Sequence, residues 1–298
     1  MMISTSILNA RDRVDSVLNL NRTNTNYIHV DVMDGKFVDD IQFKINEINA
    51  VNMVTKYPMD IHLMVNDPIK YILELKDMNI EYITFHLEIR RSKEKIISKI
   101  KEAGYKVGIS IKPDTDISKL EPYLKDIDMV LVMSVEPGRG GQEFIEDTIN
   151  RVKEVKKLID ENGYDIKIEV DGGINDNNIS KVRDADIVVV GSYIINSDNY
   201  YMSINRLLKS AKKSSNNMLL YKVLLGIGIV PFILLLLYSI YKSIQGINFF
   251  GLYLLRGFKA FSVSLYFFSV VYWPVLLLAI ILIIFSIIKL CKLKKLSK

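Results

Sequence analysis

The chain has 298 residues, enough for one or two domains, and its formal net charge of +5 hides a strong asymmetry. Residues 1–204 contain 26 Lys and Arg against 34 Asp and Glu, whereas residues 205–298 contain 13 Lys and Arg and no acidic residue. Those basic residues flank apolar runs, a membrane pattern, so the positive charge does not indicate a nucleic-acid-binding protein. The single Cys291 excludes an intrachain disulfide and fits a reducing compartment.

Short apolar segments rich in β-branched residues alternate with charged, amphipathic segments over the first 212 residues. The amphipathic segments include predicted helices over Ser92–Ala103 and Glu143–Glu161, ended by Gly104 and Gly163. The predicted strands are, in chain order, Ile3–Leu8, Tyr27–Val32, Met59–Met64, Tyr82–His86, Lys106–Ile111, Met129–Ser134, Lys167–Val170 and Ile187–Val190.

Eight strands alternating with helices in about 200 residues predict an α/β fold, a (β/α)8 TIM barrel over residues 1–212. A doubly wound open sheet is the alternative. The first strand is not followed by a G-x-G-x-x-G turn, which argues against a dinucleotide-binding version of that sheet.

The remaining residues predict a C-terminal transmembrane hairpin. A basic linker, 213–222, leads to 19 uncharged residues at 223–241 and, later, to 29 uncharged residues at 260–288. A membrane-spanning helix needs about 20 apolar residues; the first run falls one residue short of that and the second exceeds it. We therefore expect two helices, over 223–241 and about 265–288. A Lys-rich tail, 289–298, follows.

The basic residues also predict how this hairpin is oriented. Five lie between Arg206 and Lys222, five follow the second run, and three (Lys242, Arg256 and Lys259) lie between the runs. Because basic residues favour the cytoplasmic side, we expect a multi-pass membrane protein whose barrel and C-terminus both face the cytoplasm.

The predicted strand Tyr27–Val32 carries the first candidate functional residues. Side chains on a strand alternate between its faces, so His29 and Asp31 share one face and the apolar residues between them share the other. Burying two such groups is costly unless something pairs with them. A simple His–Asp hydrogen bond at a strand end and a metal site are both open at this point.

The rest of the chain favours the metal site. The three histidines, His29, His62 and His86, fall near the ends of the second, third and fourth predicted strands, where a TIM barrel carries its functional groups. Acidic residues join them at Asp31, Glu88 and Asp171. Two imidazoles with two carboxylates suit a divalent ion, Zn²⁺ first and Mn²⁺, Fe²⁺ or Co²⁺ as rivals.

Glycine-rich turns follow the last three predicted strands, at Pro137–Gly141, Asp171–Gly173 and Gly191–Ser192. Backbone amides after the last strands form the phosphate site that is common in this fold. Ordinary turns would also contain glycine, but three such turns at the correct strand ends favour a phosphorylated ligand.

Several motifs together give residues 1–205 a resemblance to the ribulose-phosphate 3-epimerase family, whose members are phosphate-binding (β/α)8 barrels. The matching stretches lie in the family's order and spacing: Thr5-Ser-Ile-Leu8, His29-Val-Asp-Val-Met-Asp-Gly35, Asp60-Ile-His-Leu-Met64, Met133-Ser-Val135, Pro137-Gly-Arg-Gly-Gly-Gln142, Glu169-Val-Asp-Gly-Gly173 and Gly191-Ser192.

The resemblance implies a role for each matching residue. His29, Asp31, His62 and Asp171 correspond to the family's divalent-metal ligands, and Asp31 and Asp171 also to its acid/base pair. Ser6, His62 and Asp171 correspond to substrate contacts. Methionines correspond to residues lining the site (Met33, Met64 and Met133), and the phosphate-binding segments comprise Gly138, Gly140, Gly141, Gly172, Gly173, Gly191 and Ser192. Arg139, which does not match the family, is a further candidate substrate contact within these segments.

The resemblance implies metal-dependent 3-epimerisation of D-ribulose 5-phosphate to D-xylulose 5-phosphate, a reaction of pentose phosphate metabolism. It implies a phosphorylated ketose as the substrate and leaves homo-oligomerisation open. Two carboxylates on opposite faces of an enediolate, with a cation near its oxygens, would move a proton from one face to the other.

Departures from the family pattern leave the sugar open. Arg139 replaces an aromatic residue, Asp39-Asp40 replaces Pro-Asn, and Tyr193 and Asp114 replace smaller residues. A six-carbon ketose phosphate such as allulose 6-phosphate is one alternative substrate, and a non-catalytic, membrane-tethered sugar-phosphate-binding barrel is another reading. The related orotidine-phosphate decarboxylase group requires Asp-x-Lys-x-x-Asp, and Asp31-Val-Met-Asp34 lacks the lysine.

Overall fold

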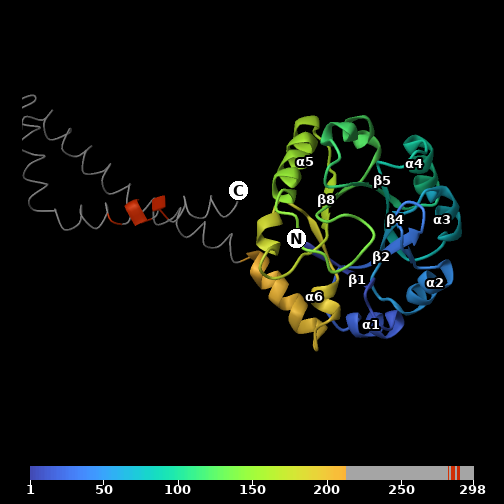
Figure 1. Cartoon of the computed structure of the whole chain (residues 1–298), viewed down its shortest axis with the longest axis horizontal. Helices are drawn as coiled ribbons and strands as arrows, with labels where there is room; N and C mark the ends of the chain where they lie inside the picture. Colours follow the sequence, from blue (N-terminus) through green and yellow to red (C-terminus); the bar gives the residue numbers. More distant parts are fainter. Residues whose placement is uncertain (213–280, 282, 286, 289–298) are drawn as a thin grey trace, which may run out of the picture. The chain divides into compact units, whose positions relative to one another are not determined.

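The computed structural model describes residues 1–212, 281, 283–285 and 287–288. Within the first of these ranges, strands alternate with helices in chain order (Figure 1). The strands are β1 (Met2–Ser6), β2 (Tyr27–Asp34), β3 (Ile41–Gln42), β4 (Met59–Met64), β5 (Ile80–His86), β6 (Lys106–Ile111), β7 (Met129–Met133), β8 (Lys167–Asp171) and β9 (Ile187–Val190).

The labelled α-helices are α1 (Arg13–Leu20), α2 (Ile45–Val54), α3 (Pro68–Glu74), α4 (Lys93–Glu102), α5 (Thr148–Asn162) and α6 (Ser192–Ile195). Residues 200–212 are also helical, as are residues 281, 283–285 and 287–288. Two 3-10 helices, η1 (Ile117–Asp126) and η2 (Ile179–Val182), take the place of longer helices before β7 and β9. Pro122 lies inside η1, where it removes one backbone donor and disfavours a regular α-helix.

The sheet closes into a barrel. Its order is β1-β9-β8-β7-β6-β5-β4-β2, all parallel, and β1 pairs with β2 as well as with β9. The predicted (β/α)8 barrel is therefore confirmed, and the open-sheet alternative is wrong because such a sheet would leave β1 or another strand unpaired at an edge. Every predicted strand is present, with ends that shift by at most two residues.

Two details differ from the sequence prediction. The short strand β3 was not expected. It pairs antiparallel with the end of β2 and so holds the loop that connects these two strands. Helix α5 begins at Thr148, not at Glu143. The five residues before α5 instead belong to the mouth of the barrel, where the amide of Ile145 donates to the carbonyl of Ser134 (2.9 Å).

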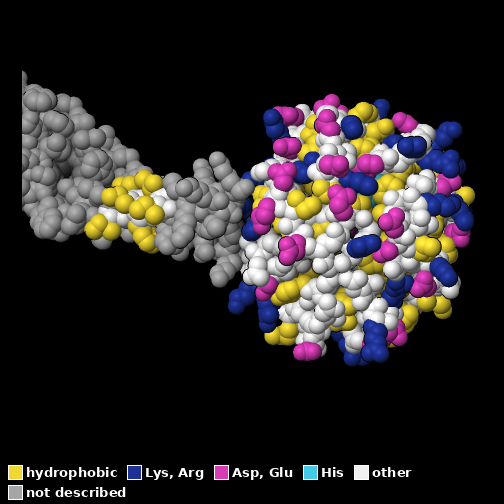
Figure 2. All heavy atoms as spheres, in the orientation of Figure 1, with side chains coloured by type: hydrophobic (Ala, Val, Ile, Leu, Met, Phe, Trp, Pro, Cys, Tyr) yellow, Lys and Arg dark blue, Asp and Glu magenta, His cyan; other side chains and the backbone are white. Residues whose placement is uncertain are grey.

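The barrel unit spans Met1–Lys212. Among the described residues, no helix is both long enough and apolar enough to cross a membrane. The predicted linker (213–222), the first predicted span, most of the second and the predicted Lys-rich tail (289–298) lie outside the described residues. On the barrel, acidic and basic side chains are interspersed over the visible face (Figure 2).

The apolar core lies between the sheet and the helices around it. Ile28, Val30 and Val32, the apolar positions of β2, are fully buried in this layer, as the alternation predicted. The lumen of the barrel has its own small apolar cluster of Tyr82, Met129 and Ile187, near the amino ends of their strands. The carboxyl half of the lumen contains buried polar groups such as His29, Asp31 and His62 as well as a second apolar cluster of Leu131, Met133 and Val135.

Gly108 allows close packing in the lumen because it has no side chain. Gly108 on β6 lies beside Thr84 on β5, and a Cβ built at Gly108 would lie 2.1 Å from the Thr84 hydroxyl oxygen and 2.9 Å from its Cβ. Rotating the threonine side chain would not remove the second contact.

Gly108→Ala should therefore lower the free energy of unfolding by about 1–3 kcal/mol, the usual cost of overpacking a core. Adding Thr84→Ala removes the 2.1 Å contact with the hydroxyl, a buried group that has no hydrogen-bond partner, but it keeps the Thr84 Cβ, so the double variant should regain part of the loss. Urea denaturation of the three proteins measures this. Equal stability of Gly108→Ala and the parent would contradict the packing.

Candidate metal and phosphate site

The ends of β2, β4 and β8 bring four of the predicted functional groups together. His29 and Asp31 come from β2, His62 from β4 and Asp171 from β8. One ligand atom from each lies within 4.8 Å of all the others. Both imidazoles are fully buried, and Asp31 is only 4% exposed. The structure thus brings together the predicted ligand set.

Both imidazoles direct one nitrogen at the two carboxylates. His29 Nε2 lies 3.2 Å from Asp31 Oδ1 and 3.9 Å from Asp171 Oδ2. His62 Nδ1 lies 3.2 Å from Asp31 Oδ1 and 3.8 Å from Asp171 Oδ2. Ser6 donates a hydrogen bond to the other oxygen of Asp31 (2.9 Å) and so fixes that carboxylate from β1.

The donor set fits a divalent cation. Two nitrogens and two carboxylate oxygens are ligands that Zn²⁺ and its neighbours in the first transition row accept. The surroundings also favour positive charge. Burial alone would lower the pKa of His29, but the Coulombic attraction of Asp31 and Asp60 outweighs it and raises that pKa well above its ordinary value. The site therefore stabilises a cation between these groups.

The two carboxylates have very different proton affinities. Burial raises the pKa of Asp171 to about 6, with the negative charge of Asp31 as the next cause. Burial also acts to raise the pKa of Asp31, but the charge and the hydrogen bond of His29 outweigh it and hold that pKa well below the usual range. A pair of carboxylates with separated pKa values suits acid/base work.

A second layer of polar groups lies beneath this site and was missed by the sequence analysis. Asp60 Oδ2 lies 2.7 Å from His29 Nδ1 and also accepts from the Ser4 hydroxyl (2.9 Å). Glu169, fully buried, lies within 4.8 Å of both His29 and Asp60. The signal was the strand alternation: Ser4, Asp60 and Glu169 each precede a site residue by two positions on the same strand.

His86 and Glu88, which sequence reasoning placed near the site, do not join the ligand group. His86 Nε2 lies 2.9 Å from His62 Nε2, on the side of that ring opposite the carboxylates. His86 Nδ1 lies 3.1 Å from Glu88 Oε2. Both residues therefore lie on the side of His62 that faces away from the proposed metal position.

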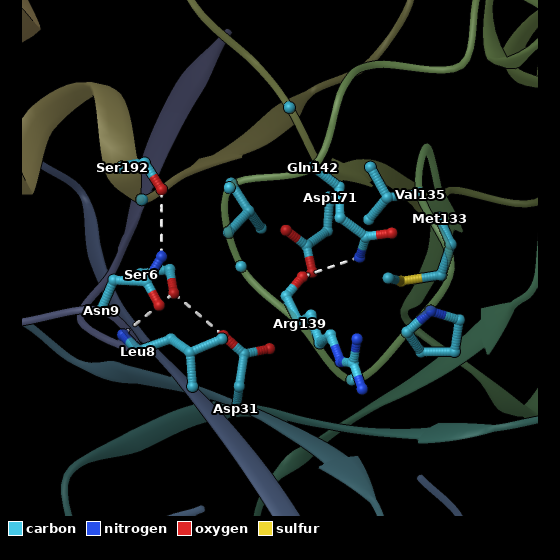
Figure 3. Close-up of a pocket in the computed structure, with 18 of the residues that line it drawn as sticks. Ser6, Leu8, Asn9, Asp31, Met133, Val135, Arg139, Gln142, Asp171 and Ser192 are labelled. Carbon is cyan, nitrogen blue, oxygen red and sulfur yellow. Dashed lines mark hydrogen bonds between the residues drawn. The ribbon is translucent and has the colours of Figure 1, made fainter. Parts of the chain in front are cut away.

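A cavity of about 370 Å³ opens above the carboxylates (Figure 3). In this view Ser6 and Asn9 lie on one side of it and Asp171, Gln142 and Met133 on the other. The predicted substrate-binding and methionine positions line it: Ser6, Asp31, Met33, Met64, Met133, Gly138, Arg139, Gly140, Gly141, Asp171, Gly172, Gly173, Gly191 and Ser192. His62 is the one predicted substrate contact that does not line the cavity; it is fully buried, as is the predicted metal ligand His29.

Two of the glycines lie in close contact with neighbouring groups, one with backbone and one with a side chain. Gly173 has φ +62°, and a Cβ there would lie 2.6 Å from the amide nitrogen of Phe144. A Cβ at Gly140 would lie 2.4 Å from the side-chain nitrogen of Asn9. Asn9, which the sequence analysis missed, donates to the Ser192 hydroxyl (3.1 Å) and so connects the loop after β1 to the start of α6.

Arg139 is the one cation among the described residues that line the cavity. Its loop is fixed by Gln142, whose amide donates to the carbonyls of Glu136 (2.7 Å) and Arg139 (2.8 Å). Recognition of an anion in this cavity therefore depends on Arg139 and on the backbone N–H groups of the glycine-rich turns.

The fold is a TIM barrel whose buried His/Asp cluster could hold a divalent metal, and comparison with known proteins gives its family. The profile of the ribulose-phosphate 3 epimerase family matches residues 2–195. The chain belongs to the ribulose-phosphate 3-epimerase family, as the motifs indicated.

Curated relatives agree over the same region. The ribulose-phosphate 3-epimerase of Methanocaldococcus jannaschii is 37% identical over 198 residues, 66% of this chain and 84% of that protein. The Escherichia coli K12 enzyme of the same name is 35% identical over 192 residues, 63% of this chain and 85% of that protein.

Solved structures show the same fold at lower identity. A 3-hexulose-6-phosphate synthase from Salmonella typhimurium aligns with a TM-score of 0.53 and 18% identity, covering 72% of this chain and 99% of that one. KGPDC from Streptococcus mutans aligns with a TM-score of 0.56 and 9% identity, covering 71% and 97%. At these identities the likeness extends to the fold alone.

We expect the purified full-length protein to bind one divalent ion per chain, because four ligand atoms converge at one buried point. His62→Ala should weaken binding by more than the ~10–100-fold typical of changes one layer beyond the ligands. Elemental analysis and competition with a chelator measure both. Asp39→Asn, an exposed acid outside the ligand group, is the control and should bind as the parent does. Unchanged affinity in His62→Ala would contradict the site.

Proposed function

We propose that this chain interconverts D-ribulose 5-phosphate and D-xylulose 5-phosphate by proton transfer at carbon 3. The observation that carries the proposal is the pair of carboxylates, Asp31 on β2 and Asp171 on β8, beside two imidazoles at the floor of one cavity. Epimerisation needs two acid/base groups, one for each face of a planar intermediate. Membership of the epimerase family supports the same activity.

The chain's own residues supply most of what the reaction requires. One of the two aspartates removes the proton from carbon 3, and the other returns a proton from the opposite face, so the sugar need not turn over. Ser6 holds the Asp31 carboxylate in place during this exchange. His29, Asp31, His62 and Asp171 would hold a divalent ion, which when bound supplies positive charge that stabilises the enediolate oxygens.

The other end of the substrate is bound by the glycine-rich turns. Gly172 and Gly173 follow β8 directly, and Gly191 and Ser192 connect β9 to α6. These are the positions at which TIM barrels bind phosphate through backbone N–H groups. The separation of proton transfer from phosphate binding fits a ketose phosphate whose reacting carbon lies several bonds from its phosphate.

Arg139 is the observation that keeps a six-carbon ketose phosphate as a second candidate. Its guanidinium provides a charged donor at the loop after β7, where the resemblance predicts an aromatic side chain. A guanidinium recognises additional hydroxyl or phosphate oxygens. A panel of five- and six-carbon ketose phosphates, compared by kcat/KM, distinguishes the two substrates; turnover of neither would favour the non-catalytic reading.

Asp31→Asn and Asp171→Asn should each lose about 10²–10⁴-fold in kcat/KM, because each change removes an acid/base group. The parent enzyme should also incorporate solvent deuterium at carbon 3 during turnover. Asp39→Asn provides a control with the same chemical change outside the site. Near-normal turnover in either site variant would contradict the proton-transfer roles.

We also propose that the residues beyond the barrel form the two membrane spans 223–241 and about 265–288, with the barrel and the tail in the cytoplasm. Two long uncharged runs and the excess of basic residues outside them support this. In the second run, Ile281, Ile284 and Ile288 are helical. Their exposed fractions are 53%, 52% and 59%.

Cysteine labelling tests this topology. The chain has one native cysteine, Cys291, in the predicted cytoplasmic tail, and Asn248→Cys adds one to the predicted external loop. An impermeant thiol reagent should label Asn248→Cys in intact cells and should reach Cys291 only after lysis. Labelling of Cys291 in intact cells would show that the orientation is wrong.

A further inference from the structure

The rear nitrogen of a metal ligand is in contact with a second histidine. His62 on β4 directs Nδ1 at the carboxylates, whereas its Nε2 lies 2.9 Å from Nε2 of His86 at the end of β5. Both rings are fully buried. A hydrogen bond between two imidazole nitrogens requires one donor and one acceptor, so the tautomer of His62 depends on which nitrogen of His86 carries the proton.

The position of the proton on His86 depends in turn on Glu88, whose carboxylate oxygens act as hydrogen-bond acceptors. One oxygen of Glu88 accepts from the backbone N–H of Lys112 (2.9 Å) and from the hydroxyl of Thr115. Its other oxygen lies 3.1 Å from His86 Nδ1. Arg151 stabilises this arrangement by donating to the carbonyls of Lys112 (3.1 Å) and Thr115 (2.6 Å).

The charge states agree with this geometry. Burial acts to raise the pKa of Glu88, but the hydrogen bonds from His86, Lys112 and Thr115 outweigh it and lower that pKa to about 2. His86 is fully buried, with a carboxylate facing its Nδ1 and an imidazole facing its Nε2, so a single proton on Nδ1 satisfies both contacts.

The hydrogen bonds can then run in one direction only. Ionised Glu88 cannot donate, so His86 Nδ1 carries the proton and His86 Nε2 accepts. His62 Nε2 must be the donor, which leaves a lone pair on His62 Nδ1. That lone pair faces carboxylate oxygens of Asp31 and Asp171 at 3.2 and 3.8 Å, acceptors that require a cation between them.

We propose that Glu88 and His86 are positioning residues that fix His62 in the Nε2-protonated tautomer, so that Nδ1 binds the divalent ion of the epimerase. This proposal rests on the proposed function for the ion's purpose, but not for its test. It gives a role to His86, the one histidine of the chain that is not a predicted metal ligand.

The other histidine ligand is held in the complementary way. His29 Nδ1 lies 2.7 Å from Asp60 Oδ2, an oxygen that also accepts from the Ser4 hydroxyl. His29 therefore donates from Nδ1 and presents Nε2 to the ligand group. One ligand is oriented by a carboxylate directly, and the other by a carboxylate acting through an additional imidazole, as outer-shell partners commonly do at metal sites.

Glu88→Gln tests the direction of the chain of hydrogen bonds without changing its shape. The N–H of Lys112 can only donate, so the glutamine carbonyl should stay there and its NH₂ group should face His86. An NH₂ group cannot accept, so His86 Nδ1 must become the acceptor and His86 Nε2 the donor. His62 Nε2 then accepts, and the proton moves to His62 Nδ1, where it blocks metal binding.

We expect Glu88→Gln to weaken Zn²⁺ binding by about 10–100-fold in chelator competition. Nitrogen-15 spectra of the metal-free full-length protein should show His62 protonated at Nε2 in the parent and at Nδ1 in the variant; three histidines keep the assignment simple. Glu81→Gln, at the opposite end of β5 and paired with Lys106 at the surface, is the matched control and should match the parent in both measurements.

An unchanged Zn²⁺ affinity or an unchanged His62 tautomer in Glu88→Gln would overturn the proposal. If that variant does not fold, His86→Phe replaces it: loss of the acceptor should again weaken Zn²⁺ binding, and parent-like affinity would overturn the proposal. Neither measurement involves turnover. A protein that shows both shifts but epimerises no ketose phosphate would refute the proposed function alone.

Discussion

The structure depends on the burial of ionisable groups inside a closed ring of strands. An unpaired charge removed from water costs several kcal/mol, so a buried ionisable group in the lumen must either face a partner or stay uncharged. Glu169 shows the second case, because neither of its oxygens has a hydrogen-bond partner and burial raises its pKa well above the ordinary value. His29 shows the first case, with Asp60 behind it and Asp31 in front, and so does His62, with His86 behind it. The lumen is therefore a connected polar network, and the position of each group in it constrains the next.

Much of this could be predicted from the sequence because it depends on local periodicity. The alternation in β2 separates His29 and Asp31 from Val30, and parallel strands that all end at one edge bring Asp171 to the same place. The glycine-rich turns were equally visible, because Gly173 marks a close approach of backbone to backbone that other residues would block. Strand ends shifted by no more than two residues because these signals are short-range.

What could not be predicted depends on distances between strands. The alternation indicates that Asp60 faces inward, but not that its carboxylate reaches His29; that requires the stagger of β4 against β2. Likewise, His86 is at the correct end of β5 to be a ligand, and only the three-dimensional arrangement places it behind His62. The start of α5 was missed because residues before Thr148 have helical periodicity yet form hydrogen bonds with the barrel mouth.

Closure of the ring also constrains how the chain can be shortened or synthesised. β1 bonds on one side to β2, its near neighbour in sequence, and on the other to β9, about as far away as the barrel allows. A protein lacking β9 would lose one strand but expose two edges, each with unpaired backbone groups prone to associate with other chains. During translation the same two edges stay open until β9 emerges, so a nearly complete barrel can still associate with other chains through its unpaired strands.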